Sequence, residues 1–151
     1  MDLSLRFEDN KSQHDDLVLR LGKRVWIVDS YYLSLDNTVT SKSDDASRVR
    51  AVLQLMLERW LVALQTLAEG ETVYLPYDFD DEDTGWLRFR RDGVNFEVCV
   101  GRADVAGYSF SPSSIGANLK KLRNFRPESE PVRGLVESVI RSVRDSISAA
   151  S

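Results

Sequence analysis

The sequence has very little cysteine and histidine: one of each in 151 residues. A single cysteine excludes an internal disulfide, and one cysteine with one histidine cannot supply the usual ligands of a structural zinc. Cys99 falls in a predicted strand, where a buried structural thiol is favoured over a nucleophile. His14 falls in a polar loop, where an exposed side chain is favoured over a catalytic or metal-binding one. We therefore expect a reduced, cytoplasmic protein with no metal centre.

Long apolar runs are also missing, since none approaches the roughly 20 residues that a membrane span requires. The first eight residues lack the basic and apolar regions of a secretion signal. No Walker loop, dinucleotide fingerprint or nucleophile elbow is present. These absences favour a non-enzymatic protein without a cofactor or a membrane partner. The length, with 42% hydrophobic and 29% charged residues, fits a single domain over residues 1–151.

The clearest pattern that is present is a β-hairpin over residues 84–100. We expect Asp92 and Gly93 to be the central residues of a type I′ turn, because glycine adopts positive φ freely and aspartate tolerates it. This register sets Phe89 opposite Phe96 on an apolar face. The outer face would then carry Trp86, Arg88, Arg90, Asn95, Glu97 and Cys99.

The remaining elements follow from apolar periodicity. Alternation predicts strands at residues 3–7, 17–21, 24–28 and 72–77, with extended structure continuing to Leu35. A wide apolar stripe predicts a long helix from Asp44 to Gly70, and two further helices follow Ser111-Pro112 and Pro131. This order predicts an α+β fold: an antiparallel sheet of about five to six strands, with the long helix packed on one face and the C-terminal helices beside it.

An acidic run over residues 78–83, DFDDED, is the most conspicuous polar feature, and it lies between two predicted strands. Calcium suits carboxylates on a turn, but the EF-hand spacing fails because Asp83 stands at position six and Phe89 at position twelve. A general acid/base pair drawn from this run and Glu97 would need a cleft that the sequence does not reveal. The remaining interpretations are a solvated loop and a loop that binds a basic protein.

The outer face of the hairpin would extend such a contact surface, because tryptophan and arginine are common interface residues. A net charge of −4 disfavours nucleic acid as the partner, since binding to phosphates needs a basic surface. The predicted partner-binding residues are Asp78, Asp80, Asp81, Glu82, Asp83, Trp86 and Arg88.

Two segments, LPYDFDDEDTGWL at residues 75–87 and GYSFSPS at residues 107–113, resemble small uncharacterised bacterial proteins, some of them similar to immunity proteins of polymorphic toxin systems. The resemblance covers residues 72–114. Immunity proteins are often small, acidic, cytosolic and non-enzymatic, and they block the active site of a basic toxin. The resemblance therefore implies a toxin-neutralising role for the acidic loop.

Two other functions remain open. The protein is a homodimer if two copies associate through an exposed sheet edge or through Leu55 and Val62, which lie off the main helical stripe and which a later helix would otherwise cover. It is an enzyme or a small-ligand-binding domain if its tyrosines converge on a deep pocket. The tyrosines in question are Tyr31, Tyr32, Tyr74 and Tyr77.

Overall fold

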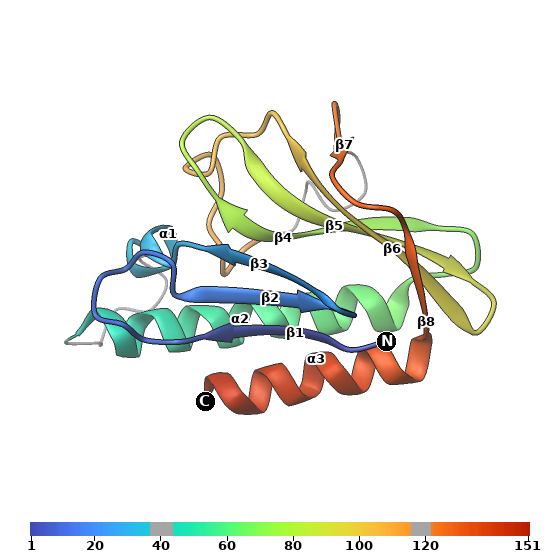
Figure 1. Ribbon diagram of the computed structural model, residues 1–151, viewed down its shortest axis with the longest axis horizontal. Coiled ribbons are helices and arrows are strands. Elements are labelled where there is room, and N and C mark those ends of the chain that lie inside the picture. Colours follow the sequence, from blue (N-terminus) through green and yellow to red (C-terminus); the bar gives the residue numbers. More distant parts are fainter. Residues whose placement is uncertain (37–43, 116–121) are drawn as a thin grey trace.

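The computed structural model describes residues 1–36, 44–115 and 122–151, and it confirms the α+β class (Figure 1). The strands form two antiparallel sheets instead of one. The first sheet has the order β1 (Leu3–Phe7), β2 (Leu17–Leu21), β3 (Arg24–Val28). The second has the order β4 (Thr72–Phe79), β5 (Thr84–Asp92), β6 (Asn95–Ala103), β7 (Arg126–Pro127), with β8 (Val132–Leu135) also paired to β6. The helices are α1 (Tyr31–Ser34), α2 (Asp45–Thr66) and α3 (Val136–Ala150).

The hairpin of β5 and β6 forms as expected, but its register differs by two residues from the prediction. Asp92 pairs with Asn95, so Gly93 and Val94 are the central turn residues. Gly93 has φ +61° and Val94 does not have a positive φ, which is the pattern of a type II′ turn with glycine first. Because the shift is even, each side chain stays on its predicted face, and Phe89 now lies opposite Val98.

The strands β1, β2 and β3 are confirmed at their predicted residues, with Gly22 at φ +60° in the turn between β2 and β3. The predicted extended structure after β3 is wrong, because Tyr31–Ser34 forms one helical turn. The buried Asp16 carboxylate accepts hydrogen bonds from the amide and hydroxyl of Ser30, and the Ser30 carbonyl accepts the amide of Leu33. This contact with the start of β2 fixes the turn, and local periodicity does not reveal it.

The long helix α2 contributes more buried side chains to the core than any other single element. Its first turn is capped by Asp44, whose side chain accepts the Ser47 amide at 2.7 Å, as predicted. The helix ends at Thr66, before Gly70, because Leu67 turns into the core with extended backbone. Seven α2 side chains are buried in a cluster that includes residues of both sheets: Val49, Val52, Leu53, Met56, Leu57, Trp60 and Leu64.

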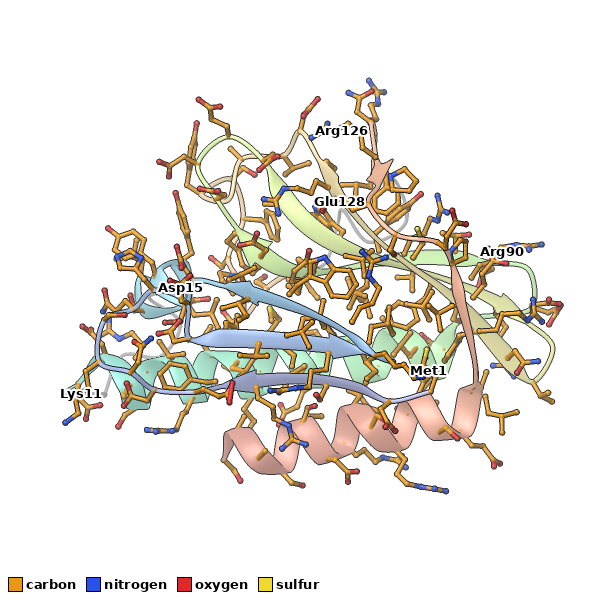
Figure 2. All side chains as sticks on the ribbon, in the orientation of Figure 1. Met1, Lys11, Asp15, Arg90, Arg126 and Glu128 are labelled. Carbon is orange, nitrogen blue, oxygen red and sulfur yellow. The ribbon has the colours of Figure 1, made fainter. Side chains whose placement is uncertain are left out.

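The C-terminal segment contains one described helix, α3, which packs beside α2 and along β1 (Figure 1). The prediction that this helix starts near Val132 is wrong, because Val132–Leu135 pairs with β6 as β8. Gly134 lets the Met1 side chain pack closely on β8, because a Cβ at residue 134 would lie 2.8 Å from Met1, which Figure 2 shows beside this strand. α3 does not cover Val62, which is 57% exposed.

The helix predicted after Ser111-Pro112 lies partly outside the described residues, and residues 111–115 form a turn with a bridge between Ser111 and Ser114. Among the residues that the structure describes, no helix is long and apolar enough to cross a membrane.

Candidate functional site: an acidic loop anchored by Arg102

The acidic run forms the connection between β4 and β5, and a β-bulge decides which way its first carboxylate points. The register shifts between Pro76 and Asp78, so that Asp78 lies opposite Gly85, which is itself opposite Arg102 on β6. The three residues therefore form a row across the sheet. Arg102 Nη1 lies 2.7 Å from Asp78 Oδ2. Without the bulge, the Asp78 side chain would face the other side of the sheet.

Arg102 also binds the far end of the loop. Its Nη2 lies 2.8 Å from Asp83 Oδ1, and its Nε donates to Asp83 Oδ2 at 3.1 Å, so the guanidinium contacts this carboxylate through two parallel hydrogen bonds. Arg126 adds a second cation at 3.5 Å from Asp83. One arginine thus joins the residues that flank the acidic tip, residues 80–82, and fixes the width of the loop.

The pKa values of the two carboxyls shift in opposite directions, although Arg102 acts to lower both. Hydrogen bonds from Arg102 lower the pKa of Asp83 below its ordinary value. Burial raises the pKa of Asp78 despite the same guanidinium, because desolvation of this more enclosed carboxylate outweighs its hydrogen bond. Arg102 thus offsets part of the desolvation of the enclosed Asp78 carboxyl, whereas at the more exposed Asp83 its hydrogen bonds outweigh desolvation.

The tip of the loop is held by backbone contacts as well. The Gly107 amide donates to the Asp80 carbonyl at 2.6 Å, and the Asp80 amide donates to the Asp83 carbonyl at 3.2 Å. A Cβ on residue 107 would lie 2.5 Å from the Asp80 carbonyl oxygen, so only glycine permits this approach. The Tyr32 hydroxyl donates to Asp81 Oδ1, which ties α1 to the loop.

The remaining carboxylates point outward. Asp80, Asp81 and Glu82 are exposed, and within the described ranges no lysine or arginine forms an ion pair with them. With Asp83 and Asp104 they line an open acidic depression of about 490 Å³. Asp104 is bound by Arg126 at 2.7 Å, and Figure 2 shows Arg126 projecting at the β7 end of the molecule. The loop thus contains two carboxylates that hold its shape, Asp78 and Asp83, and three at its tip that face solvent.

Trp86 is not the exposed contact residue that the sequence suggested. Its side chain is fully buried, its indole N–H donates to the Thr84 hydroxyl at 2.5 Å, and its ring stacks on Phe110 at 5.5 Å between centroids. The prediction was wrong because residues 104–115, which are far along the chain, cover the outer face of the hairpin at this position.

Arg88 lies on the same outer face, opposite Cys99, and is partly covered. Its guanidinium lies over the ring of Phe125 at 5.0 Å. Arg88 therefore packs on an aromatic ring at a distance from the acidic tip, and the structure does not bring it together with the carboxylates.

Two aromatic residues, which the sequence suggested only as candidates to line a pocket, lie near the loop. Tyr31 and Tyr32 were assigned to an extended segment, yet α1 sets their rings edge to face at 5.6 Å, and Tyr31 is 44% exposed. No local pattern links α1 to residue 81. The role of Arg102 was open to prediction, since correct placement of the Gly93 turn puts it opposite Gly85, next to the acidic run.

The other candidates have unremarkable surroundings. The His14 side chain is 65% exposed, with Nδ1 3.4 Å from Asp29. Cys99 is buried, its thiol donates to the Ser129 carbonyl at 3.3 Å, and burial raises its pKa, which opposes a nucleophilic role. Within the described ranges, no group of three or more His, Cys, Asp or Glu residues has the arrangement of a metal site.

The four tyrosines proposed to line a ligand pocket do not converge on one. Tyr77 is buried in the core, Tyr74 packs against Phe125 at 5.4 Å, and Tyr31 and Tyr32 lie on α1.

Comparison of the chain with protein-family models, curated proteins and solved structures found no match.

Proposed function

We propose that the protein is a non-enzymatic binding module whose acidic loop engages a basic protein partner, and that its specific role is that of a toxin-neutralising immunity protein. The observation that supports the proposal is that the carboxylates of the loop fall into two groups, one bound by Arg102 and one exposed to solvent. Asp78 and Asp83 hold the loop through Arg102, while Asp80, Asp81 and Glu82 face solvent without a cationic partner in the described part of the chain.

The anchoring of the loop supports binding on energetic grounds. A flexible acidic segment loses conformational freedom when a partner orders it, whereas this loop is already fixed at Asp78, Asp80, Asp81 and Asp83. Three exposed like charges also repel one another, and a cationic surface relieves that repulsion. Such exposed charges chiefly accelerate association, so the binding should depend strongly on ionic strength.

In this proposal Tyr31 takes the aromatic role that the sequence had suggested for Trp86. Its exposed ring lies against Tyr32, and the Tyr32 hydroxyl is bonded to Asp81, so one side chain separates Tyr31 from the acidic loop. Tyrosine is enriched among the few residues that dominate interface energies. The proposed contact surface is therefore Tyr31, Asp80, Asp81 and Glu82.

The test is affinity capture from the source cell lysate at low and high salt, with mass spectrometry of the retained proteins. The variant Asp80→Asn/Asp81→Asn/Glu82→Gln removes the three exposed charges of the loop. Its matched control, Glu58→Gln/Glu130→Gln/Asp145→Asn, removes three exposed charges elsewhere. We expect the wild type and the control to retain the same basic protein at low salt, and the loop variant to lose it.

Association kinetics with the captured protein then measure the effect. We expect the loop variant to associate about tenfold or more slowly at low salt, with a flatter dependence on salt, and the control to change by about twofold at most. Equal rates for the two variants would refute the acidic loop as the contact. The immunity role further requires that the captured protein inhibit growth when expressed alone and that co-expression of this chain restore growth.

A further inference from the structure

One edge of the three-stranded sheet, formed by β3, has no hydrogen-bonded neighbour in the described structure. Leu21 and Arg24 flank the β2–β3 turn as a hydrogen-bonded pair, so Arg24, Trp26 and Val28 bond to β2. The amides and carbonyls of Val25 and Ile27 consequently point away from β2, and within the described ranges they have no hydrogen-bond partner.

The opposite edge of the same sheet is closed. There the outward-pointing residues are Leu3, Leu5 and Phe7 of β1, and α3 lies along them (Figure 1). The Leu5 amide donates to the Ser146 hydroxyl of α3 at 3.2 Å. The bare edge of β3 is thus a particular property of that strand.

The strand itself has the composition of a pairing surface. The side chains of Val25 and Ile27 are 52% and 58% exposed, and they share the face of the sheet that lies away from the core. β-branched residues favour strand pairing. β3 contains neither proline nor a bulge, two of the features that prevent pairing at the sheet edges of monomeric proteins. Its one charged residue is Arg24 at its first position, on the same face as Trp26. An open edge with these residues is suited to accept another strand.

We infer that β3 pairs with β3 of a second copy of this chain, antiparallel and related by a two-fold axis at Trp26, so that the two three-stranded sheets join into one. In this register Val25 lies opposite Ile27 of the second copy and exchanges both backbone hydrogen bonds with it. Symmetry makes the reciprocal pair identical. Lys23 of each copy then lies opposite Asp29 of the other copy.

Charge and length select this register among the possible ones. Because only Val25 and Ile27 direct their backbone groups outward, a two-fold antiparallel pairing can be centred on Val25, Trp26 or Ile27 alone. Centring on Val25 sets Lys23 against Ile27, and centring on Ile27 sets Asp29 against Val25. Only the Trp26 centre pairs all five residues of β3 and also brings opposite charges together at both ends.

The two charged residues are available for this contact. Lys23 is exposed and has no acidic partner among the residues that the structure describes. Asp29 accepts the Asp15 amide at 2.8 Å and lies 3.4 Å from His14 Nδ1, and its side chain remains 47% exposed. The strand is therefore complementary to itself at its ends as well as at its apolar centre, and this complementarity favours a second copy over an unrelated peptide.

Sedimentation equilibrium of the full chain over about a hundredfold range of concentration tests the pairing. We expect the wild type to form a dimer at the upper end. Ile27→Lys places a lysine opposite Val25 twice in each dimer, and we expect it to weaken dimerisation about tenfold or more. Val62→Lys, at an equally exposed site on α2, is the control and should dimerise like the wild type. Circular dichroism confirms that both variants are folded.

A charge exchange tests the register. Lys23→Glu sets Glu against Asp29 at both ends and should weaken dimerisation about threefold to tenfold, and the double variant Lys23→Glu/Asp29→Lys should recover most of that loss. A wild type that stays monomeric throughout, or a dimer that Ile27→Lys leaves intact, overturns the pairing. An unchanged dimer in Lys23→Glu overturns the register. Replacing the three exposed carboxylates of the acidic loop should leave the dimer unchanged, so this result is separate from the proposed function.

Discussion

At the scale of single residues, Arg102 is the residue on which the acidic loop most depends. It contacts Asp78 at 2.7 Å and Asp83 at 2.8 Å, from the two ends of the loop. Surface ion pairs usually contribute little to stability, but this guanidinium is partly buried and satisfies a carboxylate whose desolvation is already unfavourable. Losing it would leave the enclosed Asp78 carboxyl without its guanidinium partner, so the loss should cost more than the loss of an exposed salt bridge of the molecule.

Arg102→Met should lower the free energy of unfolding by about 2–3 kcal/mol at pH 7 in urea denaturation. Arg59→Met, at an exposed position on α2 without an ion pair in the described structure, is the control and should change it by less than about 0.5 kcal/mol. Arg102 lowers the pKa of Asp83 in the folded protein. The stability that the Arg102–Asp83 pair contributes is therefore fully present above pH 3.8, and it is lost as the pH falls through the pKa of Asp83 in the folded state. The Asp83 part of the difference between the wild type and Arg102→Met should therefore narrow below pH 3.8, and the Asp78 part should narrow at higher pH because burial raises the pKa of Asp78. A difference that stays constant over the whole range would argue against the ion pairs as its source.

At the scale of elements, each boundary depends on a local signal or a distant contact. The start of α2 is local: Asp44 has extended backbone, with φ −128° and ψ 157°, and its carboxylate accepts the Ser47 amide. The start of α3 has no side-chain cap, because Leu135 there is still part of β8. Only the start of α2 can therefore be predicted from the residues next to it.

Asp44→Ala should lower the free energy of unfolding by about 1 kcal/mol, since it removes the acceptor for a first-turn amide. Asp44→Ser retains an acceptor oxygen at the same position and should recover most of the loss. Urea denaturation of the three proteins measures both effects. Equal losses for Ala and Ser would show that the carboxylate acts through its charge instead of through the capping hydrogen bond.

At the scale of the whole molecule, α2 joins the two sheets. Its apolar stripe lies in one cluster with residues of β1, β2, β4, β5 and β6. Trp60 is 1% exposed and its indole N–H donates to the Pro76 carbonyl at 3.2 Å, which links the helix directly to the edge strand β4. A core shared in this way should make both sheets unfold in one transition.

Trp60→Phe should lower the free energy of unfolding by about 2 kcal/mol, because it leaves a smaller side chain in the core and removes the hydrogen bond to Pro76. The variant keeps Trp26 in the first sheet and Trp86 in the second as fluorescent reporters. Tryptophan fluorescence and circular dichroism should give the same midpoint in urea. Two separate transitions would show that the sheets are independent units, against the single domain expected from the sequence.

The sequence alone determined the features that arise between neighbouring residues. In the strands β1, β2 and β3, apolar and polar residues alternate with a period of two. The helix α2 has a capping Asp44 and a continuous apolar stripe. These elements can therefore be predicted from the sequence alone. The acidic run was visible for the same reason. The β5–β6 hairpin was also local, although a glycine that fits either of two turn types allowed a register error of two residues.

The tertiary structure decided which side chains meet and which are covered. Trp86 is buried because residues 104–115 return over it, Tyr32 reaches Asp81 because Asp16 holds Ser30 at the start of α1, and Arg102 joins Asp78 to Asp83 because a bulge turns one residue. It also left the outer edge of β3 without a hydrogen-bonded neighbour in the described structure, while α3 closed the edge of β1. Each of these contacts joins residues far apart in the chain, and local propensity and periodicity contain no information about such distances.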